Sequence, residues 1–369
     1  MGAFAIYRLP YESTCRLVMQ EEGQPEELPS VFALGGKNGF VMAPFATDQR
    51  HPVLLIQPQT CVNLAPEMLE TTDMEWCGKM ERILGEPKQE ENTKAGTHTH
   101  YAIDFANFHS HIMEGEFSKI VLARCCREER PKELTPLRMF TRACGLYPRM
   151  FVALVSAQRC GTWLMATPEV LLEGNGRQWR TMSLAGTMKL DDKQLDFDEP
   201  PMPQPTDSHD ILWSIKNIQE QRFVSTFITE SLEQVAGDIE EKGPFTMRAG
   251  NLVHLRSDFL FTMEQADDIG KLLAILYPTP AVCGLPKDSA RDFILRNEFA
   301  PRQYYSGFAG PMATQDDTHL YVSLRCMRID ASGCFLYAGG GIMADSEQEA
   351  EWKETEDKMG TMRAVLQSP

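Results

Sequence analysis

The sequence predicts an α+β fold in which antiparallel sheets are flanked by helices. Short stretches rich in β-branched and aromatic residues follow one another in clusters, while two longer stretches carry a helical pattern. A doubly wound parallel sheet would instead require strands and helices in regular alternation. The strand candidates are residues 117–124, 150–157, 162–174, 320–329 and 334–340, and the helix candidates are residues 210–237 and 347–367.

The composition is typical of a folded globular chain, since 43% of the 369 residues are hydrophobic and 24% are charged. Two polar stretches punctuated by Gly and Pro interrupt the regular patterns. Residues 84–98 predict a surface loop that could mark a domain boundary. Residues 189–210 predict a long excursion without regular secondary structure, because Pro and Asp are too frequent there for a helix or a central strand.

The net charge of −16 argues against nucleic acid or an anionic membrane as a partner, because such binding needs clustered Lys and Arg. An anionic substrate would need a few locally placed Arg or Lys residues and a metal ion. No apolar run is long enough to span a bilayer, and the first residues lack a signal-peptide pattern. The ten cysteines form no C-x-x-C motif. We therefore expect a cytoplasmic protein whose cysteines are mostly core thiols.

Glu220 is the first candidate functional residue, because it belongs to an apolar stripe of the helix predicted at 210–237. Phe223, Val224 and Phe227 follow it at the i+3, i+4 and i+7 positions. Burying an unpaired carboxylate costs several kcal/mol or raises its pKa, so Glu220 requires a cation, a metal or a proton. A salt bridge to a neighbouring Arg would satisfy it equally well.

A second acidic group is predicted on the C-terminal helix. Glu351, Glu354 and Lys358 are spaced i, i+3 and i+7, which places them on one helix face. Such a stripe is most often a solvated row of salt bridges. The preceding glycines 339–341 could form a loop whose backbone N–H groups approach an anion, although a tight turn explains them as well.

Two charged residues stand out within predicted strands. Lys119, in the strand predicted at 117–124, lies among apolar neighbours, where a lysine can serve as a general base. A lysine at a sheet edge would only discourage aggregation. Arg325 shares a predicted strand face with Tyr321 and Ser323, and it could bind a substrate carboxylate or pair with a structural acid.

Two H-x-H pairs, His98/His100 and His109/His111, raise the question of a transition-metal site, since alternate residues of a strand share a face. They lie in or beside the polar stretch at 84–98. The carboxylate-rich groups suit a hard ion such as Mg²⁺ far better. We therefore do not expect the histidines to bind a metal.

A series of motifs resembles the chorismate-utilising enzyme family, and most closely its isochorismate synthases. In order, the motifs are FSKIVLAR, ATPEVLLEG, LAGTM, EQRFV, HLRSDF, YPTPAVCGLPKDSA, EFAPRQYYSGFAG, VSLRC, AGGGI and EWKETEDKM. The resemblance covers the chain from about residue 105 to the C-terminus. It implies one large α+β domain of two stacked antiparallel sheets surrounded by helices. Residues 1–100 would be a divergent part of this fold and residues 101–369 its chorismate-binding catalytic region.

The resemblance also implies roles for individual residues. Lys119 is expected to be the general base that activates a water molecule, and Glu169 the general acid. Glu220 and Glu354 resemble the Mg²⁺ ligands, with Glu351 reaching the waters of the ion. Lys119 must then be neutral and Glu169 protonated in the productive state, so both pKa values need to move toward neutrality.

Further matches imply how the substrate is bound. Tyr305 and Arg325 resemble the ring-side and carboxylate contacts, and Lys358 is expected to reach a carboxylate. The remaining residues implied to line the pocket are Gly186, Thr187, His254, Ala281 and Gly339.

Three residues depart from the family pattern. Tyr277 replaces the usual histidine before PTPA, and Gln219 stands where many relatives have histidine. Asn217 stands where an outer-shell acid is common, which puts in doubt the number of carboxylates around the metal.

The implied activity is the reversible, Mg²⁺-dependent isomerisation of chorismate to isochorismate, for menaquinone or siderophore synthesis. Two alternatives remain: a salicylate synthase, which would also eliminate pyruvate, and a catalytically silent chorismate-binding homologue. Ala281 argues against the former, because the salicylate-forming relatives usually have threonine there. Ala185 stands where aminodeoxychorismate synthases have a nucleophilic lysine. We expect chorismate as the only partner, and a monomer or weak homodimer.

Overall fold

The computed structural model describes residues 2–70, 75–91, 93–189, 212–249, 252–265, 268–313, 317–331 and 333–367. Apart from Lys189, the excursion predicted at 189–210 lies outside these residues. Within the described part of the chain, no helix is long and apolar enough to cross a membrane.

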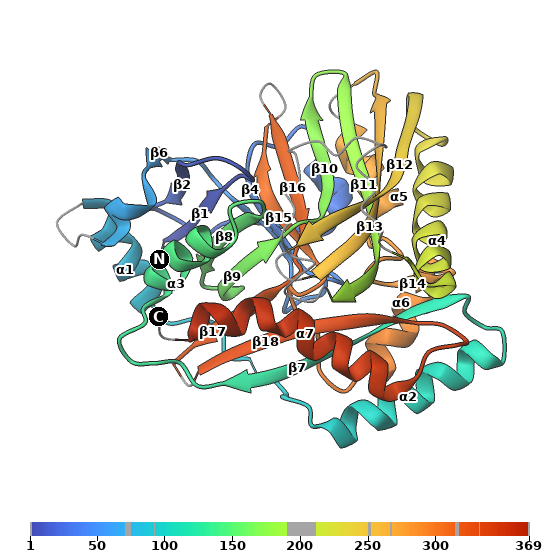
Figure 1. Cartoon of the computed structure of the whole chain (residues 1–369). Coiled ribbons are helices and arrows are strands. Elements are labelled where there is room, and N and C mark those ends of the chain that lie inside the picture. Colours follow the sequence, from blue (N-terminus) through green and yellow to red (C-terminus); the bar gives the residue numbers. More distant parts are fainter. Residues whose placement is uncertain are drawn as a thin grey trace.

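Two nine-stranded sheets form the framework, and every strand pairing in them is antiparallel (Figure 1). The first sheet has the order β14-β7-β18-β17-β9-β8-β1-β2-β6, and the second has the order β12-β13-β11-β10-β16-β15-β4-β5-β3. The predicted fold class is therefore confirmed. Strands from the first 64 residues complete one edge of each sheet.

The strands of the first sheet are β1 (Ala3–Arg8), β2 (Cys15–Gln20), β6 (Thr60–Leu64), β7 (Lys119–Glu128), β8 (Phe151–Ala157), β9 (Gly161–Thr167), β14 (Gly284–Leu285), β17 (Cys326–Asp330) and β18 (Gly333–Ile342). Those of the second sheet are β3 (Glu26–Leu28), β4 (Gly39–Ala43), β5 (Val53–Ile56), β10 (Val170–Asn175), β11 (Gln178–Lys189), β12 (Gly237–Ala249), β13 (Leu252–Thr262), β15 (Phe308–Met312) and β16 (Thr318–Val322).

The main core lies between the two sheets. Successive side chains of a strand point to opposite faces, and β8 uses both faces: Phe151 and Val155 join the inter-sheet core, while Val152 and Leu154 face the helices outside. Phe151 stacks on Tyr321 of β16 in the other sheet, with ring centroids 4.3 Å apart and an interplanar angle of 1°. This contact joins the two sheets directly.

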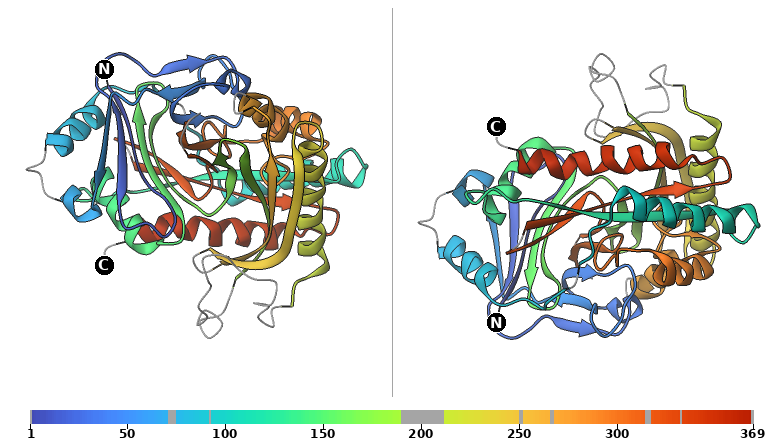
Figure 2. Two further views of the ribbon diagram at one scale, coloured as in Figure 1. Left: turned by 90° about the horizontal axis from the view of Figure 1, so that it is seen from above. Right: turned by 90° about the horizontal axis from the view of Figure 1, so that it is seen from below.

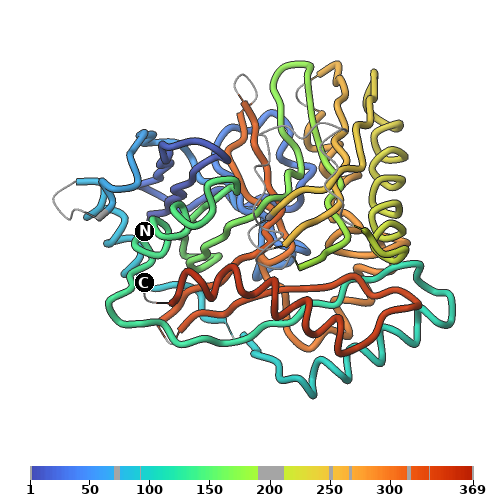
Figure 3. Tube along the Cα trace, viewed as in Figure 1, coloured from blue at the N-terminus to red at the C-terminus, as the bar shows by residue number. Residues whose placement is uncertain are grey.

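Helices cover the outer faces of both sheets. Helices α1 (Glu75–Gly85), α3 (Pro136–Leu146) and α7 (Gln348–Leu366) pack on the first sheet, and α4 (Ile215–Leu232) and α5 (Ile269–Leu276) pack on the second. The short 3-10 helices η1 (Val31–Leu34) and η2 (Pro66–Glu70) add to these layers. Figure 2 shows α4 running beside the curved strand β12. Strand β1 and the end of α7 share one apolar cluster, so the two ends of the chain lie on the same side (Figure 3).

Helices α2 (His98–Met113) and α6 (Lys287–Asn297) pack beside β7. Both H-x-H pairs lie on α2, which begins directly after the loop predicted at 84–98, and alternate residues of a helix do not share a face. His98 pairs with Glu349 at 3.0 Å, and His109 lies 3.1 Å from the backbone oxygen of Ala344.

Two predicted strands are each broken, and their breaks carry functional residues. Residues 162–174 form β9 and β10 in different sheets, with Pro168 and Glu169 between them. Residues 320–329 likewise split into β16 and β17, so the prediction of Arg325 inside a strand was wrong. Arg325 lies in the connection between the sheets, with a left-handed φ of 47°.

The glycines 339–341 belong to β18 and pair with β7, so the predicted anion-binding loop was also wrong. A short turn, residues 343–347, connects β18 to α7, and α7 packs back on the same sheet. Because these glycines have no side chains, the side chains of other elements can lie directly against the strand.

The stacked pair between the sheets gives a stability prediction. Phe151→Ala should lower the free energy of unfolding by about 3–5 kcal/mol, because it leaves a cavity at a fully buried site. Phe32→Ala, at a residue that is 62% exposed, should change it by less than about 0.5 kcal/mol. Urea unfolding of both variants measures the difference, and equal losses would contradict the assigned core.

Candidate active site

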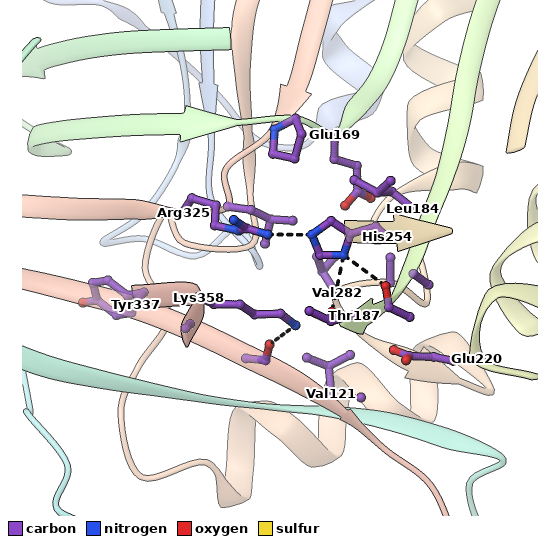
Figure 4. Close-up of a pocket in the computed structure, with 18 of the residues that line it drawn as sticks. Val121, Glu169, Leu184, Thr187, Glu220, His254, Val282, Arg325, Tyr337 and Lys358 are labelled. Atoms are coloured by element: carbon purple, nitrogen blue, oxygen red, sulfur yellow. Dashed lines mark hydrogen bonds between the residues drawn. The ribbon is translucent and has the colours of Figure 1, made fainter. Parts of the chain in front are cut away.

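A cavity lies where the connections between the sheets meet β11, β13, β18, the N-terminal part of α4 and the middle of α7 (Figure 4). Its polar lining comes from five helices and strands and from three connections, which are far apart in sequence. The charged and polar side chains that line it are Glu169, Thr187, Glu220, His254, Tyr305, Tyr337, Arg325 and Lys358.

Glu169 lies at the break between β9 and β10 and is 2% exposed. Burial raises the pKa of its carboxyl to about 8, although Lys119, Lys358 and Arg325 act in the opposite direction. The side chain is thus mostly protonated at neutral pH and can donate a proton. Figure 4 shows it on one side of the cavity, with Glu220 and Lys358 on the other.

Arg325 is held in place by neutral partners. Its Nη2 donates to His254 Nε2 at 2.7 Å, and its Nη1 donates to Thr361 Oγ1 at 3.2 Å. Burial lowers the pKa of Arg325 to about 10, which still leaves it charged at neutral pH. The described residues give it no carboxylate ion-pair partner, so this buried cation can bind an anionic group of a ligand.

His254 has one consistent protonation state in this geometry. Its Nε2 must accept from Arg325, because a guanidinium only donates. Its Nδ1 therefore carries the proton and donates to the backbone oxygen of Gly186 at 3.0 Å. Burial, and next the charge of Arg325, lower the pKa of His254 well below its ordinary value, so the ring is neutral.

Lys119 and Glu220 form an ion pair across the two sheets, with Nζ and Oε1 3.1 Å apart. The side chain of Lys119 is fully buried and that of Glu220 is 13% exposed. Burial by itself would raise the pKa of Glu220, but the charges of Lys119 and two other lysines outweigh it and lower the pKa. The buried carboxylate predicted from the helix periodicity therefore has a lysine, not an arginine, as its partner.

The backbone of β18 passes directly beneath this pair. A Cβ added to Gly341 would collide with Glu220 Oε1 and would lie 2.7 Å from Lys119 Cε. Only glycine therefore leaves room for the ion pair at this position. Lys119 itself does not line the cavity, whereas Glu220 and Gly341 do.

Two further carboxylates on α7 have lysine partners. Lys358 Nζ lies 2.7 Å from Glu354 Oε1 and donates to the backbone oxygen of Gly339 at 2.8 Å. Glu351 pairs with Lys216 from the first turn of α4. Burial, and next the charge of Glu354, raise the pKa of Glu351 to about 7.

The acidic side chains fit a hard divalent cation. Among the described residues, no three His, Cys, Asp or Glu side chains are grouped closely enough to hold a metal as they stand. Glu351 and Glu354 nevertheless both lie over Gly340, where an added Cβ would be 3.0 Å from Glu351 Oε2 and 3.6 Å from Glu354 Oε1. Glu351 Oε2 is buried and has no hydrogen-bond partner within the described chain. Carboxylate oxygens of this kind suit Mg²⁺.

The structure brings most of the predicted site residues to one cavity. Those lining it are Glu169, Gly186, Thr187, Glu220, His254, Ala281, Tyr305, Arg325, Gly339 and Lys358. Lys119, Glu351 and Glu354 lie behind this lining, each in contact with the opposite charge described above.

The three departures from the family pattern have different surroundings. Tyr277 is buried, and its hydroxyl lies 2.7 Å from the Pro44 oxygen and 3.1 Å from the Ser306 oxygen. The amide of Asn217 donates to the Thr187 oxygen at 3.4 Å. Gln219 is exposed on the outer side of α4.

Sequence reasoning missed several residues of the site. Leu184, Val282, Leu324 and Tyr337 line the cavity, but no pattern distinguishes them from ordinary core residues. Lys216 could have been noticed from its position one turn before Glu220.

Comparison with protein families finds a match to the model described as "Chorismate binding enzyme" over residues 54–367. The isochorismate synthase MenF of Escherichia coli K12 is 31% identical over 69% of this chain and 57% of its own length. The isochorismate synthase DhbC of Bacillus subtilis is 29% identical over 69% of this chain and 64% of its own length. The chain thus spans somewhat over half of these relatives.

Solved structures share the fold. The menaquinone-specific isochorismate synthase MenF from Escherichia coli superimposes with a TM-score of 0.76, covering 99% of this chain and 89% of that one at 24% identity. A putative 2,3-dihydroxybenzoate-specific isochorismate synthase, DhbC from Bacillus anthracis, gives the same TM-score with 98% and 95% coverage at 21% identity. Both neighbours support the two-sheet architecture.

The geometry around Arg325 predicts a fixed tautomer for His254. The ring should stay neutral, with its proton on Nδ1, at pH values low enough to protonate a free imidazole. Two-bond ¹⁵N–¹H correlation spectra measure this, and His254→Gln identifies the signal by its loss. A doubly protonated ring or a proton on Nε2 would contradict the assigned hydrogen bonds.

Proposed function

Because the chain belongs to the chorismate-binding enzyme family, we propose that it is an isochorismate synthase. The reaction is the reversible isomerisation of chorismate to isochorismate, in which water adds at C2 and the hydroxyl at C4 leaves. The observation that carries this proposal is the buried Glu169, whose pKa is raised by burial to about 8, across the cavity from Glu220 and Lys358. A protonated carboxyl is what the departure of a hydroxyl group requires.

Chorismate is a dianion, and the cavity offers the means to bind it. Arg325 supplies a buried guanidinium fixed by His254. Lys358 lines the cavity beside Gly339. Tyr305 is buried and stacked on Tyr337 with centroids 5.4 Å apart, which provides an aromatic wall for the substrate ring. These groups give the local positive charge that an acidic chain needs for an anionic substrate.

We further propose Mg²⁺ as the cofactor, held by Glu220 and Glu354 with Glu351 reaching its waters. When bound, the ion would neutralise the ring carboxylate of chorismate. The support for this assignment is the group of buried or partly buried carboxylates over Gly340 and Gly341, together with the unpartnered oxygen of Glu351.

In the proposed reaction, neutral Lys119 takes a proton from the water that attacks C2. Glu169 gives its proton to the C4 hydroxyl, which leaves as water. One water is consumed and one released, so substrate and product are isomers. Before it can act, Lys119 must leave its ion pair with Glu220 and lose the ammonium proton to solvent. After turnover Lys119 is again protonated, and Glu169 regains its proton from solvent.

The alternative function is a salicylate synthase, which would continue to salicylate and pyruvate. Ala281 lines the cavity and offers no hydroxyl group there. Chromatography of an incubation of the protein with chorismate and Mg²⁺ distinguishes the two. Isochorismate alone supports our proposal, salicylate with pyruvate supports the alternative, and unchanged chorismate indicates a silent homologue.

Replacing Lys119 tests the base. Lys119→Gln should reduce isochorismate formation by about 10²–10⁴-fold, because the attacking water loses its proton acceptor. Binding of chorismate in the presence of Mg²⁺, measured by equilibrium dialysis, should be largely retained. Turnover at the wild-type rate would remove Lys119 from this role.

The raised pKa of Glu169 predicts how the rate depends on pH. Burial keeps the carboxyl protonated below about pH 8, so the forward rate should fall as the pH rises through this value and the acid loses its proton. Glu169→Gln should lower kcat by about 10²–10⁴-fold with little change in chorismate binding. An unchanged rate in the variant would exclude Glu169 as the acid.

A further inference from the structure

The two carboxylate oxygens of Glu351 have very different surroundings. The residue is 1% exposed. Its Oε1 accepts a hydrogen bond from Ser346 Oγ at 2.8 Å and forms the ion pair with Lys216. Its Oε2 is buried without a hydrogen-bond partner in the described chain and lies over Gly340, beside Glu354. Two partners therefore hold Oε1, while Oε2 is free to bind a cation or to accept a hydrogen bond.

The two groups that hold Oε1 are themselves fixed. Ser346 lies in the turn before α7, and its Oγ accepts from the backbone N–H of Met343 at 3.0 Å. Lys216 lies in the first turn of α4 and is partly buried, so its ion pair connects the helix carrying Glu220 to the helix carrying Glu351. Neither side chain lines the cavity.

We infer that Lys216 and Ser346 are positioning residues for the divalent cation. They hold Oε1 of Glu351 so that its Oε2 is presented, at fixed distance and direction, to the ion or its waters. The inference rests on the proposed function for the presence of the cation, and it assigns to this chain two residues that never touch the substrate.

Charge repulsion between Lys216 and the cation would change the affinity for the cation in the opposite direction. If Lys216 merely competed with the metal for Glu351, removing its positive charge would strengthen cation binding, since like charges would no longer repel. If it positions the carboxylate, removing it weakens binding. Ser346 separates the two effects further, because its removal changes no charge.

The test measures binding of Mn²⁺, an ion that also prefers oxygen ligands, to the purified protein by electron paramagnetic resonance without substrate. Lys216→Met should weaken binding about tenfold or more, and Ser346→Ala by a severalfold factor, as expected for hydrogen bonds to a charged group. Lys216→Arg should restore part of the affinity. The matched control is Lys189→Met, since Lys189 pairs with Asp357 of the same helix at 2.7 Å but is exposed and touches none of the site carboxylates.

Unchanged or tighter Mn²⁺ binding in both Lys216→Met and Ser346→Ala would overturn the inference, as would an equal loss in Lys189→Met. If Lys216→Met does not fold by circular dichroism, Ser346→Ala and Lys216→Arg decide the question. A wild-type protein that binds no Mn²⁺ overturns the inference together with the proposed metal, whereas the product chromatogram tests the isomerase proposal independently. If the wild-type protein binds Mn²⁺ and the variants bind it equally well, only the positioning role is contradicted.

Discussion

The buried ion pair between Lys119 and Glu220 is the interaction on which the site depends. It joins the first residue of β7, in one sheet, to α4, which packs on the other sheet. A buried charge without its partner would cost several kcal/mol, so the two layers must be assembled in this register for either side chain to be tolerated. Gly341 beneath the pair follows from the same constraint, because any side chain there would occupy the space of the carboxylate.

The connections between the sheets supply the remaining chemistry. Two breaks that carry the chain from one sheet to the other place a charged or ionisable residue at the cavity: Glu169 between β9 and β10, and Arg325 between β16 and β17. Because the surrounding sheets exclude water, burial favours the protonated form of Glu169, while Arg325 keeps its charge with neutral partners. The same low dielectric thus produces a proton donor and an anion-binding group a few residues from ordinary core strands.

The sequence predicted the fold class and the largely buried carboxylate of Glu220, because periodicity reports which face of a helix or strand is covered. It failed where tertiary structure divides a continuous pattern. The run containing Arg325 looks like one strand, yet a left-handed residue sends its halves into different sheets. Glycines 339–341 looked like a loop, although they form a strand whose missing side chains make room for three carboxylates. Lys216 lies one turn before Glu220, but its ion pair with Glu351 joins two helices far apart in sequence, so no local pattern indicates its partner. The roles proposed for Lys119 and Glu169 came from family resemblance, since no spacing in the sequence relates these two residues.

In the proposed reaction, water from the solvent becomes the C2 hydroxyl while the C4 hydroxyl departs. Turnover of chorismate in H₂¹⁸O, followed by mass spectrometry of the product, tests this most directly. If solvent water attacks C2, the isochorismate carries one ¹⁸O atom, located at C2. Isochorismate without the label would mean that the hydroxyl migrates within the molecule, and this result would contradict the assignment of Lys119 and Glu169 as base and acid.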